Sequence, residues 1–110
     1  MGLLFVYGTL KSGCRNNHRL DGTFVRTIRT KPKYKLVNCG TYPGLVEGQL
    51  AIGGELYEVD DAFLKQLDYF EGVNCGVYIR ELVQLEDDTE AFAYVYQLDS
   101  PEYEGTDWHD

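Results

Sequence analysis

Leu3-Leu4-Phe5-Val6-Tyr7-Gly8-Thr9-Leu10-Lys11 opens the chain, and this stretch decides how the rest is organised. Its five successive apolar residues, 3–7, predict a strand that is buried on both faces. The run stops at Gly8, a residue type that tolerates backbone angles closed to other residues. A buried strand that breaks in this way leaves backbone N–H groups in need of a partner. The partner is either an anionic ligand or the groups of a plain tight turn.

Length and composition predict one soluble globular domain over residues 1–110. The chain is 44% hydrophobic and 25% charged, which is ordinary for such a domain. Neither an apolar run of membrane-spanning length nor a basic leader stands out, so we expect no membrane association and no signal peptide. Cys14, Cys39 and Cys75 include no C-x-x-C pair, which favours free thiols in a reducing cytoplasm.

The charge is unevenly distributed along the chain. The net charge is −8, yet residues 1–35 hold eight of the ten Lys and Arg residues. Such a basic segment could attract an acidic small molecule, or its side chains could pair with acidic neighbours across strands, and we favour the pairing. The residues concerned are Arg26, Arg29, Lys31, Lys33 and Lys35. A pI near 4.6 argues against a nucleic-acid partner.

Alternating apolar and polar residues recur through the chain and predict many short strands. The segments are 22–31, 34–37, 54–59, 77–85 and 91–97, with loops at 12–20 (or a short helix) and 39–44. Gly53-Gly54 signals a hairpin after 45–52, and Asp87-Asp88 predicts a second turn. Asp60 or Asp61 caps one amphipathic helix that runs to about Tyr69. These elements predict an α+β fold, a curled sheet or small mixed β-barrel with one or two flanking helices.

Glu71 is the candidate acid–base residue, because it comes where the helix ends and follows two aromatic side chains. A carboxyl group that aromatic rings shield from water has a raised pKa, in the range useful for proton transfer. The alternative is an ordinary solvated glutamate, although the C-terminus of a helix disfavours negative charge.

Several motifs together resemble the gamma-glutamylcyclotransferase-like family, and within it most closely the gamma-glutamylamine cyclotransferases. They are Tyr7-Gly8-Thr9-Leu10, Asn17-His18, Gly54-Glu55-Leu56-Tyr57, Phe70-Glu71-Gly72 with Tyr78 and Arg80, and a tail with Gly105 and Trp108. The resemblance covers nearly the whole chain in order. The segment 73–76 departs from it by lacking the proline expected there, which bears on the shape of the substrate.

The resemblance implies a small mixed barrel that converts gamma-glutamyl amines, such as gamma-glutamyl-lysine, or gamma-glutamyl peptides into 5-oxoproline and a released amine. It implies that Glu71 is the general acid–base residue and that Tyr78 lies beside its carboxyl group. The residues that would hold the glutamyl end are Tyr7, Gly8, Thr9 and Leu10. Because the substrate's own α-amine is the tethered nucleophile, this chemistry requires no cofactor and no metal.

Other arrangements of residues in the sequence give weaker support for a functional site. The stretch 8–13 lacks the spacing of a phosphate loop, and the cysteines and His18 make no tetrahedral metal set. Arg80 is expected to pair with a carboxylate. The expected partner is therefore a small gamma-glutamyl molecule, with a monomer favoured but not fixed by the sequence. The rival interpretation is a non-catalytic module that binds a small acid at Tyr7–Leu10.

Overall fold

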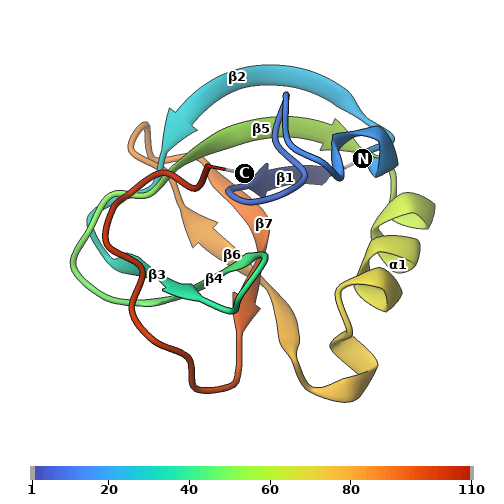
Figure 1. Cartoon of the computed structure of the whole chain (residues 1–110). Coiled ribbons are helices and arrows are strands. Elements are labelled where there is room, and N and C mark those ends of the chain that lie inside the picture. Colours follow the sequence, from blue (N-terminus) through green and yellow to red (C-terminus); the bar gives the residue numbers. More distant parts are fainter. Residues whose placement is uncertain (1, 110) are drawn as a thin grey trace.

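The structure, a computed structural model, describes residues 2–109 as a strongly curled sheet with one α-helix beside it (Figure 1). The strands are β1 (Gly2–Val6), β2 (Thr23–Arg29), β3 (Tyr34–Asn38), β4 (Pro43–Glu47), β5 (Gly53–Val59), β6 (Tyr78–Gln84) and β7 (Glu90–Tyr96). The helix α1 spans Asp61–Phe70, and two short 3-10 helices are η1 (Asn17–Arg19) and η2 (Val73–Cys75). The predicted α+β class is confirmed.

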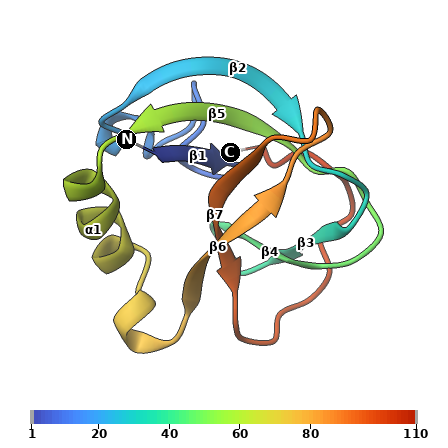
Figure 2. The same ribbon diagram turned by 180° about the vertical axis from the view of Figure 1, so that it is seen from behind.

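The sheet is mixed and open. Its order is β2-β5-β1-β7-β4-β3, and β6 pairs with the other edge of β7. One edge of β7 accepts two parallel strands in succession, β1 through Leu4 and Phe92, then β4 through Leu45 and Val95. The sheet therefore forks at β7. The strands at the two ends of this order, β2 and β3, do not pair with each other (Figure 2). The sequence predicts either a curled sheet or a small mixed β-barrel. The structure has the curled sheet, and the prediction of a barrel is corrected because the two end strands do not pair.

The first strand is buried on both faces, as its sequence predicts. β1 lies between β5 and β7. Leu4 and Val6 pack into one hydrophobic cluster, whereas Phe5 and Tyr7 pack into the other. Strand β1 therefore separates the two clusters of the core, and the loop that follows it starts from a fixed position.

Gly53-Gly54 does not form the predicted hairpin. Both glycines lie inside β5, where they pair with β2. A Cβ atom on Gly54 would lie 2.4 Å from the Val6 carbonyl oxygen and 2.6 Å from Cζ of Phe5. Gly54 is required because β1 comes unusually close here, which a local sequence pattern does not distinguish from a turn.

We expect Gly54→Ala to lower the free energy of unfolding by about 3 kcal/mol, at the upper end of the cost of overpacking a core. Gly2→Ala in β1 is the control, because a Cβ atom there meets its nearest neighbour at an ordinary 3.6 Å. Chemical denaturation of both variants tests this. Equal stability of the two variants would show that β5 moves to accommodate the methyl group.

The helix begins and ends where the sequence indicates. The Asp60 side chain accepts a hydrogen bond from the Phe63 N–H at 2.7 Å, and Phe63, Leu64 and Leu67 are buried. The helix stops at Glu71, and Gly72 follows in the left-handed conformation at φ 74°. Glu71 therefore lies directly at the C-terminal end of a helix packed on the core. Among residues 2–109, no helix combines the length and the apolar character that crossing a membrane requires.

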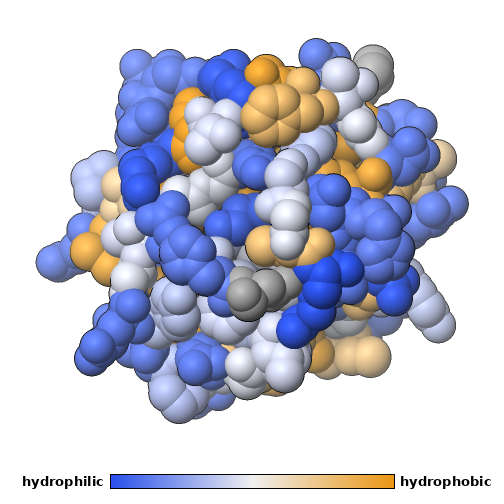
Figure 3. All heavy atoms as spheres, turned by 45° about the horizontal axis from the view of Figure 1, so that its top comes forward, coloured by the Kyte–Doolittle hydropathy of each residue, from blue (hydrophilic) through white to orange (hydrophobic). Residues whose placement is uncertain are grey.

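Four of the five basic residues singled out in the sequence make ion pairs, with acidic residues of the β6–β7 turn and of the chain after β7. The pairs are Arg26–Asp87, Arg29–Asp107, Lys31–Asp88 and Lys35–Glu102. Hydrophilic residues cover most of the face that includes β2, and apolar residues are scattered over it (Figure 3). These four basic side chains are thus paired with carboxylates, whereas Lys33 donates to Oε1 of Gln84 at 2.6 Å.

Candidate active site

A pocket of about 350 Å³ lies between the loop after β1 and the C-terminal end of α1. Its lining includes the predicted site residues Tyr7, Gly8, Thr9, Leu10, Glu71 and Tyr78. The chain brings them together because β1 and α1 pack on the same hydrophobic cluster through Leu4 and Leu67. The residues that the sequence predicts as one site therefore share one cavity.

The Glu71 carboxyl group is partly buried in this pocket. In the described part of the chain, no hydrogen bond or ion pair reaches its oxygens. Burial without a compensating charge raises the pKa of Glu71 from 4.5 to about 7. A carboxyl group of this kind both accepts and releases a proton at neutral pH, which is the requirement for general acid–base chemistry.

In the loop at residues 7–10, the backbone carbonyl groups of Gly8, Thr9 and Leu10 accept hydrogen bonds, whereas their N–H groups are open. The Gly8 carbonyl accepts from the Lys11 N–H at 3.1 Å, and the Thr9 carbonyl accepts from the Asn16 N–H at 2.9 Å. The Leu10 carbonyl accepts from Nδ2 of Asn17 at 2.8 Å. Within residues 2–109, the N–H groups of 8, 9 and 10 donate to no protein acceptor. Three consecutive open donors at a pocket suit a carboxylate or an oxyanion.

Gly8 is needed for a reason other than the one its sequence suggests. Its φ is not in the left-handed region. A Cβ atom at this position would lie 2.8 Å from Cγ of Pro43, which begins β4. The missing side chain lets the loop lie against Pro43, which also lines the pocket.

The Tyr7 hydroxyl is committed to the fold. It donates to the Tyr94 carbonyl and accepts from the Leu45 N–H at 3.1 Å, so it connects β7 to β4 where the sheet forks. Burial and the nearby Glu71 charge raise the pKa of Tyr7 well above its usual value. Any contact of Tyr7 with a ligand must therefore use its backbone or ring.

We expect Tyr7→Phe to lower the free energy of unfolding by about 1–3 kcal/mol, because it leaves the buried Leu45 N–H without an acceptor. Tyr69→Phe is the matched control, since the Tyr69 side chain is 77% exposed. That variant should remain within about 0.5 kcal/mol of the native protein. A thermal melt of each variant provides the comparison, and equal melting temperatures would refute a bridging role.

Tyr78 forms part of the pocket wall. Its hydroxyl donates to the Pro43 carbonyl at 2.7 Å, and its ring packs edge-on against Tyr96. Burial, together with the charge of groups that include Glu71, raises the pKa of Tyr78 far above its usual range. It therefore stays protonated beside the pocket and holds Pro43 in place.

Arg80 pairs with a carboxylate, as the sequence predicts, and that carboxylate belongs to Asp68. The Arg80 Nε lies 2.9 Å from Oδ1 of Asp68, which also accepts from the Tyr94 hydroxyl at 2.6 Å. These contacts tie the last turns of α1 to β6 and β7. Arg80 thus helps to hold the helix end that bears Glu71, and its ion pair is with Asp68 and not with Glu71.

Sequence reasoning missed the part of the pocket that the segment before β4 supplies. Tyr42 and Pro43 line the pocket, and so do Arg15 and Asn16 from the segment after the first loop. Arg15 donates to the Thr41 carbonyl, which joins these two segments. Tyr42-Pro43-Gly44 predicts only a loop, and no spacing in the chain relates it to Glu71. The large aromatic side chain of Tyr42 within a loop is the signal that could have indicated a pocket wall.

Known proteins resemble this chain over most of its length. The chain matches the family described as gamma-glutamyl cyclotransferase, AIG2-like, over residues 4–110. It belongs to that family. A putative gamma-glutamylcyclotransferase of Vibrio cholerae is 43% identical, with 86% of this chain and 82% of that protein covered. Gamma-glutamylaminecyclotransferase A of Danio rerio is 36% identical, with 91% and 72% covered.

Solved structures show the same fold for this member of the gamma-glutamyl cyclotransferase, AIG2-like family. The crystal structure of an AIG2-like protein from Mus musculus superposes with a TM-score of 0.79 at 32% identity, covering 97% of this chain and 88% of that one. An uncharacterised protein from Pyrococcus horikoshii reaches a TM-score of 0.80 at 23% identity, covering 97% and 89%. The resemblance inferred from the motifs is confirmed at the level of the family and the fold.

Proposed function

We propose that this protein is a cofactor-independent cyclotransferase that converts a gamma-glutamyl amine, such as gamma-glutamyl-lysine, into 5-oxoproline and a free amine. In this proposal Glu71 is the general acid and base. The observation that carries the proposal is a single carboxyl group with a pKa of about 7 in the same pocket as three open backbone donors. The names of the relatives support the reaction type.

The reaction needs few groups from the protein. The neutral α-amine of the substrate attacks its own γ-carbonyl carbon, and a new C–N bond closes a five-membered ring. The old C–N bond to the leaving amine breaks. The attacking nitrogen loses one proton and the leaving nitrogen gains one, so one carboxylate between them can carry it. Holding the substrate folded for attack supplies most of the remaining rate enhancement.

Glu71 fits the two halves of this task. As a carboxylate it takes the proton from the attacking nitrogen, and as a carboxylic acid it gives the proton to the leaving nitrogen. Near pH 7 both forms are populated, since the pKa of Glu71 is about 7. The open N–H groups of Gly8, Thr9 and Leu10 would bind either the α-carboxylate of the substrate or the oxyanion of the intermediate.

Two other candidates use the same pocket. One is the same cyclisation of a different gamma-glutamyl compound, because the lining does not by itself define the leaving amine. The other is a non-catalytic module that binds a small acid on the loop at 7–10. The partly buried position of Glu71 in the pocket favours the enzyme, because a binding module has no use for a raised carboxyl pKa.

A panel assay tests the proposal. The protein is incubated with gamma-glutamyl-lysine, other gamma-glutamyl amines and gamma-glutamyl amino acids, and 5-oxoproline is measured in each case. We expect one group of substrates to release 5-oxoproline and a stoichiometric amount of free amine. If every compound binds and none is cyclised, the binding module is correct. Turnover of gamma-glutamyl amino acids alone would change the substrate class and leave the chemistry intact.

A further inference from the structure

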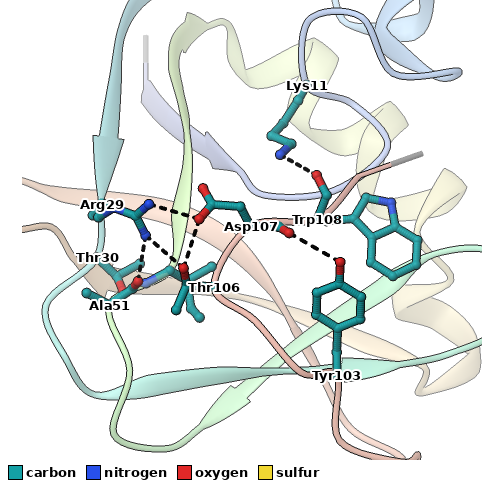
Figure 4. Close-up of polar contacts among 9 residues, drawn as sticks. Lys11, Arg29, Thr30, Ala51, Tyr103, Thr106, Asp107 and Trp108 are labelled. Carbon is teal, nitrogen blue, oxygen red and sulfur yellow. Dashed lines mark hydrogen bonds and ion pairs between the residues drawn. The ribbon is translucent and has the colours of Figure 1, made fainter.

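Lys11 comes directly after the loop at 7–10 but lies behind it, outside the pocket that contains Glu71. It lines a separate polar hollow of about 280 Å³ together with Trp108 and other residues. Its backbone N–H closes the turn by donating to the Gly8 carbonyl at 3.1 Å. Its ammonium group donates to the Trp108 carbonyl at 2.7 Å (Figure 4). Lys11 therefore connects the turn to the C-terminal segment.

The acceptor in this contact is held rigidly. Trp108 is only 6% exposed and packs into the same hydrophobic cluster as Phe5 and Tyr7. The ring of Tyr103 lies against it, with the two ring centres 5.1 Å apart. Figure 4 shows the Tyr103 hydroxyl directed at the Asp107 carbonyl, a contact of 3.3 Å. The Trp108 carbonyl is thus a fixed point and not the end of a loose tail.

The preceding residue ties the same segment to the sheet. Asp107 Oδ2 accepts from Arg29 at 2.8 Å and from the Thr106 hydroxyl at 2.8 Å. The Thr106 carbonyl accepts from the Gly53 N–H at 2.9 Å. A Cβ atom on Gly53 would lie 2.0 Å from Oδ1 of Asp107. The glycine that begins β5 thus leaves room for the Asp107 side chain.

We propose that Lys11 is a positioning residue for the substrate loop and that the C-terminal segment 106–108 is the anchor that holds it. This inference rests on the proposed function, because it assigns a role to the loop that would bind the substrate. Residues 106–108 fix the Lys11 side chain, and Lys11 fixes the turn that begins at Gly8. The open N–H donors of that turn are then already arranged before a ligand arrives. Less conformational entropy is therefore lost when the ligand binds.

The position of Lys11 makes this role separable from folding. A second contact holds the exit of the loop, because the Ser12 N–H donates to Oε1 of Glu55 at 2.8 Å. Loss of the Lys11 ammonium group therefore leaves the chain path intact and loosens only the turn. Since Lys11 does not line the pocket with Glu71, its loss should affect ligand binding more than the chemical step.

The test compares Lys11→Met with Lys11→Arg and with Lys35→Met. Lys11→Met should raise KM for the best substrate of the panel about tenfold and change kcat by less than about threefold, as expected for losing one hydrogen bond from a charged donor. Lys11→Arg keeps a donor for the Trp108 carbonyl and should restore KM to within about threefold. Lys35→Met removes a different lysine contact, the 3.7 Å pair with Glu102, which lies outside residues 106–108, and should leave KM unchanged.

Amide hydrogen exchange provides a readout that does not depend on activity. In Lys11→Met, and not in Lys35→Met, the amides of residues 11 and 16, which donate to the carbonyls of Gly8 and Thr9, should exchange at least about fivefold faster in the ligand-free protein, because the turn opens more often. Unchanged exchange, or an equal rise in both variants, would overturn the positioning role. If the exchange responds and no compound is cyclised, the positioning role stands and the proposed reaction fails. A fall in kcat with KM unchanged in Lys11→Met would also contradict the positioning role.

Discussion

Glu71→Gln should lower kcat by about 10²–10⁴-fold, which is the range that a positioned proton-transfer group contributes. Gln has nearly the same shape as Glu but cannot accept and return the proton. It should therefore leave the pocket and the loop at 7–10 unchanged. The measurement is the rate of 5-oxoproline release under saturating substrate, with the affinity for gamma-glutamyl-lysine followed by calorimetry.

Glu81→Gln is the matched control for this experiment. Glu81 is exposed on β6 and does not line the pocket, so the same chemical change there should leave kcat within about twofold. A Glu71→Gln protein that binds substrate and still releases 5-oxoproline at the native rate would remove Glu71 from the mechanism. Loss of both binding and turnover would indicate that the carboxylate also holds the ligand.

The same substitution should change how stability depends on pH. In the folded protein the pKa of Glu71 is raised from 4.5 to about 7 by burial, so the folded state holds this proton more tightly than the unfolded chain. The favourable contribution of the protonated group is fully present below about pH 4.5 and is lost as the pH rises through 7. The native protein should lose about 3 kcal/mol through this one group between pH 4 and pH 8.

Urea denaturation of the native protein and Glu71→Gln at several pH values measures this effect. As the pH rises from 4 to 8, the free energy of unfolding of Glu71→Gln should increase by about 3 kcal/mol relative to that of the native protein. For Glu81→Gln the corresponding difference should change little, because that side chain is exposed. A constant difference between native protein and Glu71→Gln would mean that water reaches the Glu71 carboxylate freely.

The sequence predicts the elements of this fold better than their arrangement. The burial of 3–7 and the capped helix could be predicted because local pattern decides both. The fork at β7 could not be predicted, because two strands far apart in the chain meet on one edge of a third. Gly53-Gly54 was wrongly predicted as a hairpin turn for a related reason, since the requirement for Gly54 comes from the approach of Val6 and Phe5.

The candidate site shows the same division. Glu71 stands out because it follows aromatic residues at the end of a helix, and the loop at 7–10 because a buried strand stops at a glycine. Their presence in one pocket follows from the packing of α1 against β1. The engagement of the Tyr7 hydroxyl with β4 and β7 depends on tertiary contacts, and so does the contribution of Tyr42 and Pro43 to the wall.

The pKa of the Glu71 carboxyl group in the ligand-free protein tests the central claim most directly. Carbon-13 NMR titration of glutamate side-chain carboxyl groups gives this value, and the Glu71 signal is assigned by its absence from Glu71→Gln. We predict a midpoint at a pH of about 7. A midpoint near the ordinary 4.5 would contradict the account, because a solvated carboxylate of that acidity could not serve as both base and acid at neutral pH.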